Sequence, residues 1–400
     1  MKTIIINELK PGMFVVGVTR QEGHVRVKSQ GWVRTQGAIE ALHKAGVLEV
    51  EIDPDKALQA KQQTPPEHCE AAHKDSVTVH DPWHKTTSVD AELDLATTLY
   101  EEAKGIQEKA FADVKAGKAI AVEEFKQTAS GFIDSIFRNQ DALACIARIR
   151  EKDSYLLEHS LNVSILMSIF AKHLGLERNI IEQLATGALL HDIGKIQISN
   201  ELLNKPGKLS DDEYNLMKDH AKYSYDIVAQ SGLGQIATEI AGFHHERLDG
   251  SGYPFGKKAD ELSQYVRMAA IVDVYDALTA ERVYKAGLTP IRAFRILKEG
   301  TPSHYDAELL AHFINCIGVY PVGTLVKLKS ERIGIVASSN PKEPLKPVVK
   351  VFYHAKNMLY TEVKDIDLAD KRVTDELEAA IKPEEFSIDL IRFFRHTMMP

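Results

Sequence analysis

The sequence predicts a mainly α protein, with an all-helical core, a small α+β module before it and a small β-rich appendage after it. Between about residues 91 and 320, apolar residues recur every three or four positions, which is typical of amphipathic helices. In residues 1–56 and 321–400, short runs of β-forming residues alternate with turn residues, as in small sheets. A polar stretch, residues 57–90, separates the first module from the helices.

The N-terminal module is expected to combine short strands with one short helix. The strand-like runs are 3–6, 13–18, 24–27 and 47–52, with a turn at Pro11-Gly12 and a helix at 37–45. The linker that follows contains Cys69 and four histidines: His68, His73, His80 and His84. Their spacing matches no standard zinc finger, so a solvated linker is favoured over a zinc site.

Helix ends are well marked in the middle segment. Ser210 and Glu213 form a capping-box pattern before an apolar stripe, and Gly175 follows Leu174 as a stop signal. After Pro321 the predicted strands cover 323–328, 334–337 and 347–353, and a last helix is expected near 388–396.

Composition excludes several functional classes. The chain has 49 Lys plus Arg and 57 Asp plus Glu, a formal net charge of −8, which argues against binding to long nucleic acids. Its three cysteines are odd in number and far apart, which fits a reducing compartment. We find neither a signal-peptide core nor an apolar run long enough to span a membrane, so we expect a cytoplasmic protein that does not contact membranes.

The candidate chemistry lies on the apolar faces of five consecutive helices. A lone histidine on such a face is more often a satisfied core residue than a metal ligand. Seven metal-compatible groups would be costly to bury separately, and a shared partner would remove that cost. These groups are His159, His191, Asp192, His220, His244, His245 and Asp273.

A dinuclear metal centre would satisfy all seven groups. Mixed imidazole and carboxylate ligation suits Fe, Mn or similar ions better than a thiolate zinc site. In the adjacent pair His191-Asp192, one carboxylate can bridge two ions while the histidine binds one of them. Two ions about 3.5–4 Å apart can lower the pKa of a bridging water and clamp an in-line phosphoryl displacement.

These motifs resemble the HD-GYP subgroup of the HD-superfamily phosphohydrolases. The similarity rests on His191-Asp192 with Gly194-Lys195, and on the complete run HHERLDGSGYP at 244–254, and it covers about residues 130–320. It implies an all-helical catalytic domain, a non-haem iron or manganese centre, and hydrolysis of bacterial cyclic dinucleotides, chiefly cyclic di-GMP. The Pro-Gly-Met turn at 11–13 is similar to an N-terminal extension of unclear role in some members.

One position departs from part of the family. Members with a third metal carry a Glu four residues before the histidine that matches His159, and this chain has Tyr155 there. Glu158 is three residues along, roughly 300° around the helix. We therefore expect two metals.

Other residues are candidates for contact with substrate. Lys195 either complements a helix dipole or, as we favour, faces a substrate phosphate. The resemblance places Arg282 and Lys285 on the phosphates, whereas a surface salt bridge explains Arg267 about as well as a substrate contact does. Tyr253 lies in a Gly- and Pro-rich turn, for which a structural role alone is one interpretation. The resemblance favours a role of this turn in shaping the substrate pocket and in contacts with protein partners. Asp276 is a candidate partner of a ligand histidine, and Asp249 a brace of the loop.

The leading hypothesis is a phosphodiesterase in which a metal-bridging hydroxide attacks one phosphorus of a cyclic dinucleotide, with Asp192 and Lys195 as catalytic residues. The product would be a linear dinucleotide. Two alternatives are a cyclic-dinucleotide sensor or scaffold that acts through its N-terminal module or Tyr253 loop, and a less selective phosphohydrolase of mononucleotides. Cyclic di-GMP and 3′,3′-cyclic GMP-AMP differ only at base edges, and no residue can be assigned to those edges from the sequence.

Overall fold

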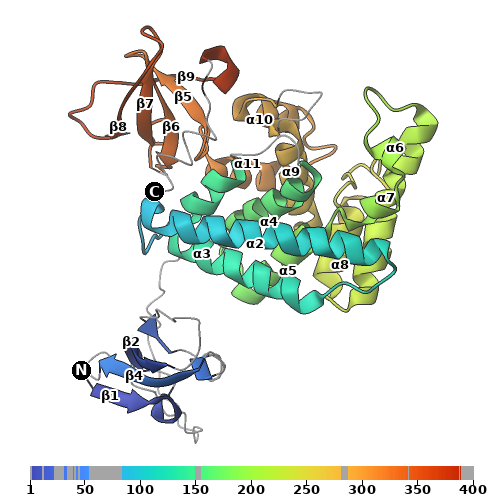
Figure 1. The fold of residues 1–400 in the computed structure, drawn as a ribbon. Helices are drawn as coiled ribbons and strands as arrows, with labels where there is room; N and C mark the ends of the chain where they lie inside the picture. The colour runs from blue at the N-terminus through green and yellow to red at the C-terminus, as the bar shows by residue number, and fades with distance from the viewer. Residues whose placement is uncertain are drawn as a thin grey trace, which may run out of the picture. The chain divides into compact units, whose positions relative to one another are not determined.

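The computed structural model describes residues 2–10, 13–21, 31–33, 39, 42–43, 46–53, 83–148, 155–280, 287–340, 342–386 and 388. It divides into two compact units, residues 1–78 and 79–400, and each is described by itself (Figure 1). The mainly α fold class is confirmed, with a helical core and a small sheet at either end of the chain.

The N-terminal unit contains an antiparallel four-stranded sheet in the order β1-β4-β2-β3. Its elements are β1 (Lys2–Ile5), η1 (Ile6–Glu8), β2 (Phe14–Gln21), β3 (Gly31–Trp32) and β4 (Val47–Asp53). Buried Val47, Val50 and Ile52 make β4 the centre of the small core. The expected turn at Pro11-Gly12, strand 24–27, most of helix 37–45 and the linker up to residue 82 lie outside the described residues.

The helical part of the second unit is built around α4 (Tyr155–His173), which packs against α2 (Val89–Lys115), α3 (Val122–Arg148), α5 (Arg178–Leu190), α9 (Gln264–Thr279) and α11 (Ala307–Ile317). Described side chains of α4 are buried almost throughout. The remaining elements are η3 (Ile193–Gln197), α6 (Asn200–Leu203), α7 (Asp211–Ser231), α8 (Gln235–Phe243), η4 (Ala259–Glu261) and α10 (Pro290–Glu299).

Local signals in the sequence account for several helix ends. The hydroxyl of Ser210 accepts from the Glu213 N–H at 3.3 Å, and the Glu213 carboxylate accepts from the Ser210 N–H at 2.7 Å, so the predicted capping box begins α7. Gly175, with φ of 70°, follows α4 in the left-handed conformation that glycine adopts without strain. These caps set where the helices that carry the site begin and end.

The C-terminal sheet is antiparallel, in the order β8-β7-β6-β5-β9. Three strands cover the predicted ones: β5 (Leu325–Leu328), β6 (Arg332–Ser338) and β7 (Val348–His354). Two more were not expected: β8 (Leu359–Asp367), whose side chains are mostly exposed, and β9 (Leu377–Ala380), which has four residues and no buried position. A short 3-10 helix, η5 (Pro383–Phe386), follows β9, and the expected helix at 388–396 lies outside the described residues except for residue 388.

Two further features complete the second unit. The carboxylate of Asp141, buried in α3, accepts hydrogen bonds from Lys85 at 2.5 Å and from Ser338 of β6 at 3.0 Å, which ties the sheet to the helices. Within the described part of the chain, the helices are all too short or too polar to cross a membrane.

A close approach of two backbones brings the ligand-bearing elements together. At Gly194 in η3, a Cβ atom would lie 2.1 Å from the His220 carbonyl oxygen and 2.5 Å from the Ser224 nitrogen of α7. The Gly194 N–H also donates to the Ser224 hydroxyl at 2.9 Å. Because any side chain would push α7 away, glycine here is what allows His220 to lie beside Asp192.

We expect Gly194→Ala to lower stability by about 1–3 kcal/mol and to reduce metal binding, because the methyl group has no space and α7 must shift. Thermal unfolding and metal content of the purified variant measure the two effects. Gly105→Ala is the matched control, since this exposed glycine of α2 has nothing within 4 Å of its added Cβ and should gain about 0.5–1 kcal/mol. Equal unfolding temperature and metal content in the two variants would contradict the prediction.

Candidate metal centre

The seven predicted groups converge in the interior of the helical domain. His159 comes from α4, His220 from α7 and Asp273 from α9, while His191 and His244 are the residues that end α5 and α8. Asp192 and His245 directly follow the last two. All are buried except His245, whose side chain is 23% exposed. Three overlapping sets each place their ligand atoms within 4.8 Å of one another: His159-His191-Asp273, His191-Asp192-His244 and His220-His244-His245.

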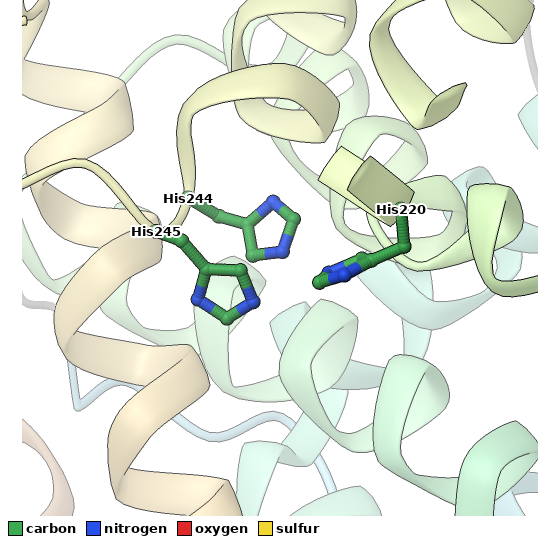
Figure 2. A group of neighbouring side chains, drawn as sticks. All are labelled: His220, His244 and His245. Atoms are coloured by element: carbon green, nitrogen blue, oxygen red, sulfur yellow. The ribbon is translucent and has the colours of Figure 1, made fainter. Parts of the chain in front are cut away.

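The carboxylate of Asp192 stands between two groups of imidazoles. Its Oδ1 lies 3.4 Å from His220 Nε2 and 3.9 Å from His244 Nε2. Its Oδ2 lies 3.5 Å from His191 Nε2 and 3.8 Å from His159 Nε2. Figure 2 shows one side of this arrangement, the three imidazoles of His220, His244 and His245 turned toward a common space. Each oxygen of Asp192 therefore faces its own pair of nitrogen donors.

Four polar atoms of the cluster have no hydrogen-bond partner among the described residues. They are Nε2 of His191, His220 and His244, and Oδ1 of Asp192. Buried polar atoms are almost always paired, since leaving one unpaired costs about 1–3 kcal/mol. Four such atoms directed into one space fit the donor set of a bound metal, so the residues present suit the predicted cofactor.

Backbone carbonyls orient these imidazoles. The Nδ1 atom of His191 lies 2.7 Å from the Ala188 carbonyl oxygen, and that of His220 lies 2.6 Å from the Met217 oxygen. At the end of α8, the Nδ1 of His244 lies 3.1 Å from two carbonyl oxygens of the last turn. The last carbonyls of a helix lack intrahelical partners, so a histidine there donates Nδ1–H to them and presents an unprotonated Nε2.

Electrostatics keeps most of the ligand groups in their metal-binding form. Burial lowers the pKa of His191, His220 and His244, and lowers that of His245 to about 3, so these imidazoles are neutral at pH 7. For Asp192, burial opposes ionisation, but Lys195 and the surrounding histidines outweigh it and hold the pKa of the carboxyl well below its usual value. The site thus offers neutral nitrogens and an ionised carboxylate.

His159 is the exception among the histidines. Burial alone would lower its pKa, but hydrogen bonds to Asp273 at 2.9 Å and Asp276 at 2.7 Å outweigh burial and raise the pKa to about 9. Its Nδ1 faces Asp276 and its Nε2 faces Asp273. A metal must displace the proton on Nε2, so binding becomes more favourable as the pH rises toward 9, while Asp276 keeps the ring in place.

Two basic residues have different surroundings. The Lys195 ammonium lies 2.5 Å from Asp192 Oδ2 with its side chain 19% exposed, so it stands at the mouth of the cluster. Arg267 instead donates to the carbonyls of Leu262 and Ala259 and pairs with Asp306 at 3.2 Å. These contacts favour the structural alternative for Arg267, because its guanidinium holds η4 and the start of α11, and a substrate contact by Arg267 stays a prediction. Arg282 and Lys285 lie outside the described residues.

The loop after α8 places Tyr253 against the cluster. Its ring centroid is 4.7 Å from that of His245 and 6.3 Å from that of His220. Buried Glu246 organises the loop by accepting from the Phe255 N–H at 2.8 Å and the Lys257 N–H at 3.0 Å. The sequence analysis did not assign this role to Glu246. The available signal was its position, directly after the His244-His245 pair and before a Gly-rich run.

Two other expectations concern supporting residues. Asp276 contacts a ligand histidine, as expected, and Asp249 braces the loop by accepting from the Ser251 N–H at 2.9 Å. Two other histidines of the helical segment, His173 and His304, lie away from the cluster. The ring of His173 lies near the rings of Trp83 and His312, and that of His304 lies near Asp249.

Comparison with known proteins places this site in a family. Residues 144–309 match the family model described as an HD domain. The chain is 32% identical over 381 residues to the Cyclic di-GMP phosphodiesterase PA4108 of Pseudomonas aeruginosa, covering 94% of this chain and 91% of that protein. The chain belongs to the HD-GYP phosphodiesterase family. It is accordingly an enzyme with metal-dependent phosphodiesterase chemistry, and the hypothesis of a non-catalytic scaffold is not supported.

Further matches concern the ends of this HD-GYP protein and its more distant relatives. Residues 1–125 match a domain of unknown function (DUF3391), and 325–386 match a KOW domain associated with HD domain. The 3′3′-cGAMP-specific phosphodiesterase 3 of Vibrio cholerae is 36% identical over 170 residues, covering 42% of this chain and 37% of that protein. The solved structure of Bd1817 from Bdellovibrio bacteriovorus has 19% identity, covers 78% of this chain and 97% of that one, and has a TM-score of 0.47.

We expect Asp276→Asn to weaken metal binding about 10- to 100-fold, because the carboxylate that orients His159 and raises its basicity is lost. Titration of metal-depleted protein with Mn(II) measures the affinity. Asp134→Asn is the control, since this exposed carboxylate of α3 pairs only with Arg178 at the surface among the described residues. An affinity equal to that of the control would contradict the role of Asp276.

Proposed function

We propose that this enzyme hydrolyses a bacterial cyclic dinucleotide, cyclic di-GMP first and 3′,3′-cyclic GMP-AMP as the second candidate, to a linear dinucleotide. The observation that carries the proposal is the position of Asp192, with one oxygen toward each of two groups of histidines. Cyclic di-GMP comes first because a relative named for it matches 94% of this chain. The second candidate is favoured by the relative named for 3′3′-cGAMP, which matches 170 residues, or 42%, of this chain.

We assign the ligands to two sets that share Asp192, which faces His191 with one oxygen and His220 with the other. His159, His191 and Asp273 form one set, and His220, His244 and His245 form the other. Nitrogen and oxygen donors of this kind suit Fe or Mn. When bound, two such metals supply a water of lowered pKa and a clamp on the phosphoryl oxygens. Glu158 does not argue for a third ion, because its carboxylate pairs with Lys104 of α2 at 3.3 Å.

Residues at the mouth of the cluster would bind and orient the phosphodiester. Lys195, whose ammonium contacts the Asp192 carboxylate, would supply a positive charge on a flexible side chain to the phosphoryl oxygens. Tyr253 forms an aromatic wall beside His245. Arg282 and Lys285 follow α9 in the sequence and remain proposed phosphate contacts. Contacts of the Tyr253 loop or the N-terminal module with signalling proteins, and a cytoplasmic location, also remain proposals.

Asp192→Ala is expected to abolish turnover, because the variant loses the carboxylate shared by both ligand sets, while the helical circular-dichroism signal remains. Hydrolysis should be measured without oxygen, with Fe(II) or Mn(II), on cyclic di-GMP and 3′,3′-cyclic GMP-AMP side by side. The wild type should show the higher kcat/KM on cyclic di-GMP, and Asp226→Ala on the exposed face of α7 should match the wild type. Wild-type turnover by Asp192→Ala would refute the assignment, and a higher kcat/KM on the mixed dinucleotide would reverse the order of substrates.

Metal analysis of protein purified without oxygen should find two Fe or Mn ions per chain, because we assign the ligands to two sets and Glu158 pairs with Lys104. The count should fall below two in Asp192→Ala, which removes a ligand from both sets. Three tightly bound ions per wild-type chain would rule out the dinuclear assignment.

A further inference from the structure

An exposed tyrosine, Tyr214, packs against Tyr253 on the side of that ring away from the metal centre. Tyr214 precedes His220 by six residues on α7, about 9 Å along the helix axis. Its side chain is 48% exposed, yet its ring packs edge-on against that of Tyr253, with centroids 6.3 Å apart and planes at 80°. The two tyrosines come from different elements, α7 and the loop after α8, so the fold brings them together.

Tyr253 links Tyr214 to the ligands. Its ring lies 4.7 Å from that of His245, so rings follow one another from the metal centre outward in the order His245, Tyr253, Tyr214. An aromatic surface therefore runs from the ligands to solvent.

Lys218 adds a positive charge to this surface. It lies one helical turn after Tyr214, and its ammonium is 5.2 Å from the centroid of the Tyr214 ring, a cation–π distance. Single exposed aromatic residues are common on protein surfaces and need no explanation. Tyr214 differs because its ring contacts Tyr253 on one side and the Lys218 ammonium on another, so it extends the aromatic surface that begins at the catalytic site. Lys218 also places a positive charge there, in a chain whose net charge is −8.

This geometry suits a nucleobase. A cyclic dinucleotide with one phosphate at the metal centre directs its bases away from the metals, and proteins hold unpaired bases by stacking them on aromatic side chains. We propose that Tyr214, supported by Lys218, is the stacking surface for a base of the substrate and so a specificity-determining residue of this enzyme. The inference rests on the proposed function and names the residue that distinguishes a dinucleotide from a simple phosphodiester.

Steady-state kinetics of Tyr214→Ala and Tyr214→Phe test this role. With cyclic di-GMP, Tyr214→Ala should raise KM about 5- to 150-fold, the effect of losing one stacked base, with kcat within about twofold of the wild type. Tyr214→Phe keeps the aromatic face and should restore KM. With methyl p-nitrophenyl phosphate, a diester without bases, both variants should match the wild type, because no base is present to stack.

The matched control is Tyr360→Ala, which removes a tyrosine of similar exposure, 57%, from β8 far along the chain and should leave both substrates unaffected. An unchanged KM for cyclic di-GMP in Tyr214→Ala would overturn the inference. An equal loss on the base-free diester would also overturn it, since it would indicate damage to the metal centre. Failure of the wild type to hydrolyse either cyclic dinucleotide would instead overturn the proposed function together with this inference.

Discussion

Burial of the Asp192 carboxylate among imidazoles is the constraint on which the helical domain depends. Its oxygens face histidines from α4, α5, α7 and α8, and its Oδ1 has no hydrogen-bond partner among the described residues. A buried carboxylate is tolerated only where positive charge or donors compensate it. Lys195 supplies part of that compensation and bound metals would supply the rest, so folding of this region and metal binding are energetically coupled.

The domain meets this constraint mainly with backbone groups. Two ligand histidines end their helices, where free carbonyls accept Nδ1–H and turn Nε2 toward the shared space. Gly194 lets η3 approach α7 closely enough for His220 to join Asp192. The positions of the ligand side chains are thus set by helix ends and by one close backbone contact. The carboxylates of Asp273 and Asp276 orient the ring of His159.

The net charge of −8 describes the chain and not its site. It argues against an extended basic surface for a long polyanion, but a small anionic ligand needs only a local positive region. Lys195 lies beside Asp192 and Lys218 lies beside the Tyr214 ring, and metals would add to this positive charge. The N-terminal sheet has its own core, whereas the KOW-like sheet shares the hydrophobic core of the helices and is tied to α3 through Asp141 and Ser338.

The sequence by itself determined the mainly α class, the capping box at Ser210 and the ligand candidates, because these depend on short-range periodicity and on caps within one turn. It could not reveal β8, whose side chains are mostly exposed, or β9, whose four residues include no buried position, because neither strand carries a clear apolar pattern. Only the tertiary structure decided that Arg267 braces η4 and α11, that Glu246 holds the loop, and that each Asp192 oxygen faces a different pair of histidines. Those relations join residues from separate elements, and their geometry is set by how helices pack.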